Sequence, residues 1–214
     1  VTIVRKLRII ICTQTKYMMK TTLQHNFITK AHNLKGLFDG VRKMSQFMRR
    51  LEADALIDPL RYDPQKYLGD GFEFFIELFL MLYSCDKRIG VSNYVPCQEN
   101  DNGVDGTGIN TKGEPCVVQI KYRTNTQGFL TANIDHLSNM ISDGQFNHGV
   151  VADMSDPKNY RHFIFTTAEG LNFYTDQEMY KSKVKCFGYN DFRVLLDDNI
   201  VFWNQALEIV KGLR

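Results

Sequence analysis

The sequence predicts an α/β protein in which helices flank a mixed central β-sheet and a helical segment precedes that sheet. Residues 34–56 and 200–213 carry apolar residues at the spacing of amphipathic helices. Short runs rich in β-branched and aromatic residues begin near residue 88, and a helical pattern interrupts them. Because strands and helices alternate along this part of the chain, a sheet covered by helices is the expected architecture.

Length and composition indicate a globular protein with a substantial core. The chain has 214 residues, of which 43% are hydrophobic, and this suits one domain of ordinary size. No apolar run is long enough to cross a bilayer, so we expect no membrane partner and a cytoplasmic location. Five cysteines without a CxxC spacing predict reduced thiols rather than a disulfide framework or a zinc site.

Residues 1–33 form a basic arm or leader. Residues 1–38 hold seven of the 26 basic residues and none of the 24 acidic ones, which leaves the remainder mildly acidic. Such an arm suits contacts with a phosphate backbone, and a solvated leader is the equal alternative. Met18 and Met19 are a plausible natural start, and import into an organelle stays open. The candidate DNA-binding residues of the arm are Arg5, Lys6, Arg8, Lys16 and Lys20.

Residues 34–68 are predicted to be a long helix, over 34–56, followed by a linker. Pro59 and Pro64 mark residues 57–68 as the boundary before a domain at 69–214. The apolar face of the helix either packs on its own chain or forms a coiled-coil seam that makes a homodimer or higher homo-oligomer. That seam would consist of Leu34, Leu37, Val41, Met44, Met48, Leu51 and Ala55.

The domain at 69–214 begins with a predicted helix over 71–84, for which Asp70 is the expected N-cap. Glu73 and Glu77 lie one turn apart on this helix. Further helices are expected at 131–141, 174–182 and 200–213. Strands are expected at 88–97, 103–109, 115–123, 148–153 and 161–167.

The segment "GVDGTGINTKGEPCVVQIKYR" predicts a hairpin that gathers polar groups at one end of the sheet. Residues two apart in a strand face the same side, so Gln119 and Lys121 project together, while the hairpin places Asp105 beside them. Gly103 and Gly106 let the backbone bend sharply there.

A carboxylate and an amide oxygen suit Mg²⁺, with Mn²⁺ as a substitute. A nearby lysine can orient the attacking water and offset negative charge, which is the chemistry of phosphodiester hydrolysis. An ordinary exposed strand edge is the alternative interpretation of this spacing.

The runs "GVDG" and "VVQIKYR" resemble the catalytic core of the PD-(D/E)xK nucleases, in the Mrr-like restriction endonuclease branch that carries glutamine in place of the last acid. The segments "GFEFFIELFLMLY" and "HFIFTTAEGLNFYTDQEMY" resemble the first helix and a later strand–helix unit of that branch. The similarity covers residues 70–205. The proline that precedes the family's aspartate is replaced here by Val104.

The resemblance implies a restriction-endonuclease-like core that cuts double-stranded DNA with Mg²⁺, in a restriction, phage or homing role. By position, Asp105 and Gln119 would be metal ligands and Lys121 the catalytic lysine. Glu73 would complete the metal site, with Glu77 as the alternative helix acid, and Arg123 would contact DNA. A DNA-binding module that keeps the nuclease fold without cleavage is the rival function. His136 and His162, like most aromatic residues, are expected to be structural.

Overall fold

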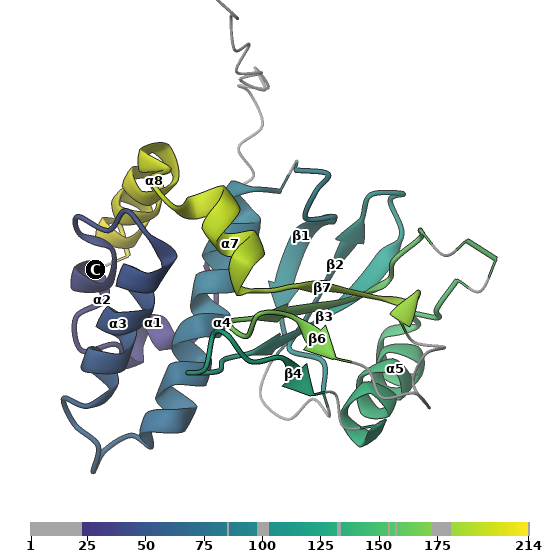
Figure 1. Ribbon diagram of the computed structural model, residues 1–214, viewed down its shortest axis with the longest axis horizontal. Coiled ribbons are helices and arrows are strands. Elements are labelled where there is room, and N and C mark those ends of the chain that lie inside the picture. Colours follow the sequence, from purple (N-terminus) through teal and green to yellow (C-terminus); the bar gives the residue numbers. More distant parts are fainter. Residues whose placement is uncertain are drawn as a thin grey trace, which may run out of the picture.

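The computed structural model describes residues 23–84, 86–97, 103–131, 134–153, 155–156, 158–172 and 181–213 (Figure 1). Its centre is a five-stranded sheet with the strand order β1-β2-β3-β5-β7. The first three strands pair antiparallel, and β3, β5 and β7 pair parallel, so the sheet is mixed as predicted. Its strands are β1 (Val91–Pro96), β2 (Gly106–Asn110), β3 (Pro115–Lys121), β5 (His162–Thr166) and β7 (Val184–Phe187).

Two short strands, β4 (Leu130–Thr131) and β6 (Leu171–Asn172), form a separate parallel pair. The strand expected at 148–153 is wrong, because the preceding helix α5 (Ile134–His148) extends into it. Gly149 ends that helix with a φ of +65°, and residues 150–153 lie outside any strand. The helix expected at 174–182 lies almost entirely outside the described residues.

The long helix α4 (Pro64–Leu82) is the centre of the molecule. The carboxylate of Asp63, not Asp70, caps it by accepting a hydrogen bond from the Lys66 amide at 2.8 Å. Pro64 suits the first helical position, since its missing N–H would have no helical partner there. The predicted linker therefore ends earlier, and α4 joins the segments 34–68 and 69–214 through one helix.

The predicted helix over 34–56 is two helices, α2 (Leu34–Phe38) and α3 (Met44–Ala55). The chain turns between them at Gly40, whose φ of +68° suits glycine. The predicted seam residues are all at most 4% exposed inside this chain, so they are not free to pair with a second subunit. Packing on the same chain, the alternative interpretation, is confirmed.

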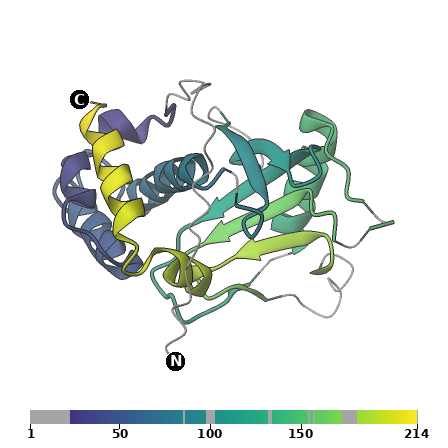
Figure 2. The ribbon, with the colours of Figure 1, turned by 90° about the horizontal axis from the view of Figure 1, so that it is seen from above.

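The leader predicted at 1–33 is too long, because its last part belongs to the core. The helix α1 (Phe27–Lys30) packs on α4, and the Phe27 ring is fully buried against Tyr67 and Phe74. With α2, α3 and α8 (Ile200–Lys211), it forms a helical layer on the side of α4 remote from the sheet (Figures 1 and 2).

The two faces of the sheet are covered by different helices. Val118, Ile120 and Phe165 belong to the core that includes α4 and the helical layer, whereas Val117 and Ile164 pack with α5. The helix α7 (Tyr189–Leu196) adds Phe192 to the first core. Phe187, Phe202 and Trp203 are also buried there, as expected for structural aromatics. Within the described residues, no helix is both long and apolar enough to cross a membrane.

Candidate active site

The β2–β3 hairpin forms as predicted and sets the position of the three motif residues. Gly106 pairs with Val118, and the Asp105 amide donates to the Val118 carbonyl at 2.8 Å, so Asp105 comes opposite Gln119. Gln119 and Lys121 share the α5 face of β3, while Val118 and Ile120 point to the α4 core. The carboxyl end of β3 therefore meets the beginning of β2 at one edge of the sheet.

Asp105 and Lys121 lie side by side at this edge. Lys121 Nζ is 3.7 Å from Asp105 Oδ2, and the same oxygen accepts a hydrogen bond from the Ile120 amide at 2.5 Å. Burial raises the pKa of Asp105 from 3.8 to about 6, a direction that Glu73 reinforces and Lys121 opposes. The carboxylate is thus a partly buried anion, with 20% of its side chain exposed, that an additional positive charge would stabilise.

Gln119 is 4% exposed and is held in one orientation. Its Nε2 donates to the Gly103 carbonyl at 2.8 Å, which leaves Oε1 for another contact. Gly103 has a φ of +114°, and a Cβ there would lie 3.3 Å from the Met140 amide nitrogen of α5. Gly106 is needed for space rather than for the predicted bend. It lies in β2, where a Cβ would come within 2.3 Å of the Tyr94 ring.

The two acids of α4 have different surroundings. Glu77 is 6% exposed and accepts hydrogen bonds from the backbone amides of Gln24 at 2.7 Å and His25 at 3.1 Å. Burial raises the pKa of Glu77 above its usual value in spite of these bonds. The Glu73 side chain is 30% exposed and lies close enough to Asp105 to raise the pKa of that residue. Of the two, Glu73 is the more exposed acid and the one whose charge acts on Asp105.

His25 is a site residue that the sequence did not reveal. Its Nε2 lies 3.1 Å from Glu73 Oε2. The residue belongs to a stretch that composition marks only as a basic leader, and no motif singles it out. Its contact with Glu73 forms only in the folded protein, where residues 23–30 pack along α4.

The carboxylate and amide oxygens at this end of the sheet are ligands of the kind that Mg²⁺ prefers. Within the described residues, no three His, Cys, Asp or Glu side chains gather as a metal-binding group. A site here would therefore combine the Asp105 and Glu73 carboxylates with the Gln119 Oε1, and water and phosphate oxygens would complete it. The raised pKa of Asp105 supports this fit, because a cation would offset the poor solvation of this carboxylate and its repulsion by Glu73.

A recess adjoins Lys121 on the α5 side of the sheet. Gln119, Lys121 and Arg123 contribute its polar groups, and Leu130 and Leu137 contribute apolar ones. Arg123 is exposed, as a DNA-contacting residue would need to be. Thr166 and Thr167, at the end of β5, are fully buried and do not line the recess. The other proposed DNA contacts, from Arg5 to Lys20, and the side chain of His136 lie outside the described residues.

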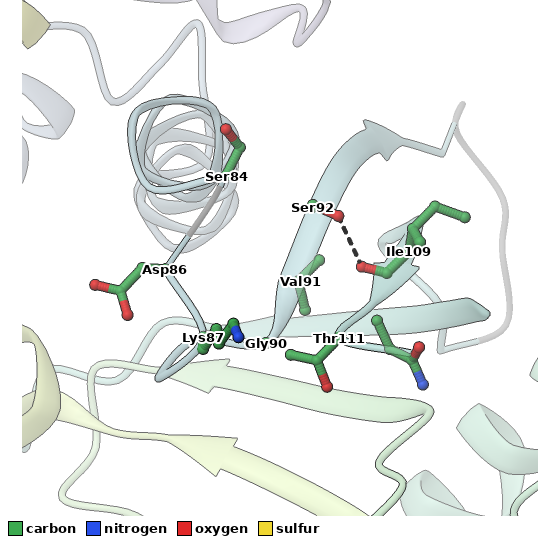
Figure 3. A pocket seen from close by; sticks show the side chains of 9 residues that line it. Ser84, Asp86, Lys87, Gly90, Val91, Ser92, Ile109 and Thr111 are labelled. Carbon is green, nitrogen blue, oxygen red and sulfur yellow. Dashed lines mark hydrogen bonds between the residues drawn. The ribbon is translucent and has the colours of Figure 1, made fainter. Parts of the chain in front are cut away.

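A second recess lies at the opposite end of the β1–β2 pair, between these strands and the segment that follows α4 (Figure 3). Ser92, Ile109 and Thr111 line it together with Lys87, and the Ser92 hydroxyl donates to the Ile109 carbonyl at 3.1 Å. Its acid, Asp86, is engaged by the Arg88 guanidinium. None of the predicted catalytic residues lines this recess.

No family model matches this sequence, and no curated protein or solved structure is significantly similar to it. Functional inference therefore rests on the residues of the site and on the short motif that they form.

Proposed function

We propose that this chain is a metal-dependent endonuclease that hydrolyses phosphodiester bonds in double-stranded DNA. The observation that carries the proposal is the meeting of Asp105, Gln119 and Lys121 at one end of the sheet, where the charge of Glu73 on α4 also acts on Asp105. The same four residues are those that the resemblance to PD-(D/E)xK nucleases implies.

Each side chain has a role that its surroundings support. Asp105 is ionised above a pH of about 6, and with Glu73 and the Gln119 Oε1 it would hold Mg²⁺. When bound, Mg²⁺ supplies Lewis-acid polarisation of the phosphate and lowers the pKa of a water molecule. The Lys121 ammonium, kept near the site by Asp105, offsets negative charge that develops on the phosphate and orients the attacking water.

One observation favours the rival function, a DNA-binding module without cleavage. Gln119 replaces an acid with a neutral amide, and the described residues offer only two carboxylates at this edge. A site with fewer charges binds Mg²⁺ less strongly. Such a module would shift DNA in a gel but leave it intact.

The decisive experiment is the nicking and linearisation of supercoiled plasmid by the full chain, with Mg²⁺ and then with EDTA. Cleavage should require the metal. Asp105→Asn should abolish it, and Lys121→Ala should reduce the rate by about 10²–10⁴-fold, the usual contribution of a positioned acid–base or charge-stabilising group.

Lys112→Ala is the matched control, because Lys112 lies on the turn of the same hairpin and pairs with Asp156 rather than with the site. It should cleave at the wild-type rate. Folded Asp105→Asn and Lys121→Ala proteins that cleave as fast as wild type would refute the proposed function. Binding of DNA without any cleavage would favour the rival.

A further inference from the structure

Residues 23–30 run along one side of α4 and meet three of its acids in succession. The backbone amides of Gln24 and His25 donate to Glu77, and the His25 ring contacts Glu73. One turn nearer the start of α4, Lys30 Nζ forms an ion pair with Asp70 Oδ2 at 2.8 Å. The segment is thus fixed to the helix that carries the proposed metal-binding acid.

The hydrogen bonds of His25 determine its tautomer. Its Nδ1 accepts a hydrogen bond from the Phe27 amide at 3.2 Å, so this nitrogen carries no proton. The proton of the neutral ring therefore resides on Nε2, which donates it to Glu73 Oε2 at 3.1 Å. The ring is largely enclosed, with 11% of the side chain exposed, and this limits its rotation.

We propose that His25 is a positioning residue for the metal site, which orients the Glu73 carboxylate by donating its Nε2–H to Oε2. The bond occupies one oxygen and leaves Oε1 to face a cation. It also fixes a glutamate side chain that would otherwise lose rotamer freedom when metal binds. This inference rests on the proposed function, since it assumes that Glu73 is a ligand.

The position of His25 is not explained by attachment of the segment alone. Glu77 holds the backbone of residues 24 and 25, Phe27 is buried in the core, and Lys30 pairs with Asp70. None of these contacts is made by the imidazole itself. The side-chain bond to Glu73 is therefore the contact with a consequence for the site.

The test is the binding of Mn²⁺ alone, measured by calorimetry on the full chain. His25→Leu removes the donor and should weaken Mn²⁺ binding by about 10-fold or more, the usual effect of losing a partner that orients a ligand. His25→Gln should recover most of that loss, because its amide can donate from a position close to Nε2. The metal concentration for half-maximal plasmid cleavage should shift in parallel.

His32→Phe is the matched control, because this ring stacks on Tyr67 with centroids 5.6 Å apart and does not touch Glu73. It should bind Mn²⁺ as wild type does. Long-range ¹H–¹⁵N NMR should show the Nε2–H tautomer for His25 in wild type.

Wild-type affinity in His25→Leu, or equal losses in His25→Leu and His25→Gln, would overturn the positioning role. Asp105→Asn separates this failure from that of the proposed function. If Asp105→Asn also binds Mn²⁺ normally, the metal lies elsewhere and both inferences fall. If only Asp105→Asn loses Mn²⁺, the metal site stands and the role of His25 does not.

Discussion

Asp105→Asn should stabilise the metal-free protein while it removes function. The pKa of Asp105 rises from 3.8 to about 6 on folding, because the carboxyl is buried beside Glu73. A change of pKa from 3.8 to about 6 corresponds to about 3 kcal/mol between the protonated and ionised forms. Ionisation therefore destabilises the folded state, and this penalty grows as the pH rises from about 4 through 6. Asparagine resembles the protonated carboxyl and avoids the penalty.

Guanidinium unfolding in EDTA measures this effect directly. At pH 7.5, Asp105→Asn should exceed the wild-type free energy of unfolding by up to about 3 kcal/mol, and the gain should vanish near pH 3.5. Saturating Mg²⁺ should stabilise only the wild type, by about 2.7 kcal/mol at 100 times the dissociation constant. A variant no more stable than wild type at pH 7.5 would refute the reasoning.

Asp86→Asn is the matched control for this measurement. The Asp86 carboxylate accepts hydrogen bonds from Arg88, which lower its pKa. Removal of this charge should destabilise the protein at pH 7.5, the opposite of the effect expected at Asp105. If both substitutions changed the free energy of unfolding in the same direction, the effect at Asp105 would not be electrostatic.

Three further predictions concern the rest of the fold. His162 is fully buried and burial lowers its pKa to about 4, so the free energy of unfolding of wild type, measured relative to that of His162→Leu, should fall by up to about 3 kcal/mol as the pH falls from 6.5 to 4. Gly106→Ala should cost about 1–3 kcal/mol in thermal unfolding, because the new Cβ displaces the Tyr94 ring. A shortened protein that begins at Leu34 should not fold, because it lacks the buried Phe27. A protein that begins at Leu23 should keep the fold and bind DNA more weakly in low salt, because it lacks the basic residues of the arm.

The hairpin was predictable because its signals are local. Alternation along β3 and the turn residues of "NTKGEP" determine which side chains face together, whatever the rest of the chain does. Short strands such as β7 lack such a signal: Val184–Phe187 has two partly exposed residues and, among the strands that the structure describes, pairs only with β5. Its place in the sheet depends on a partner that is distant in sequence.

The apolar spacing of residues 34–56 correctly predicted which residues are buried but not the break between α2 and α3. Periodicity of this kind persists through a turn when both helices use the same face, and the positive φ of Gly40 interrupts the helix without interrupting the pattern. Periodicity also cannot identify what covers a face. Here the cover is the chain itself, so the same residues that suggested a dimer form the core.

The two glutamates of α4 show why a site needs tertiary structure to be resolved. A spacing of four residues places Glu73 and Glu77 on the same side of the helix, so their spacing offers no basis for a choice between them, and only the resemblance favours Glu73. Their difference comes from residues 24 and 25, about fifty positions earlier in the chain, whose amides enclose Glu77 and whose imidazole contacts Glu73. A segment that looks like a leader by charge thus encloses Glu77 and leaves Glu73 the more exposed of the two acids. The proposed site therefore extends beyond the motif to the chain that packs behind it.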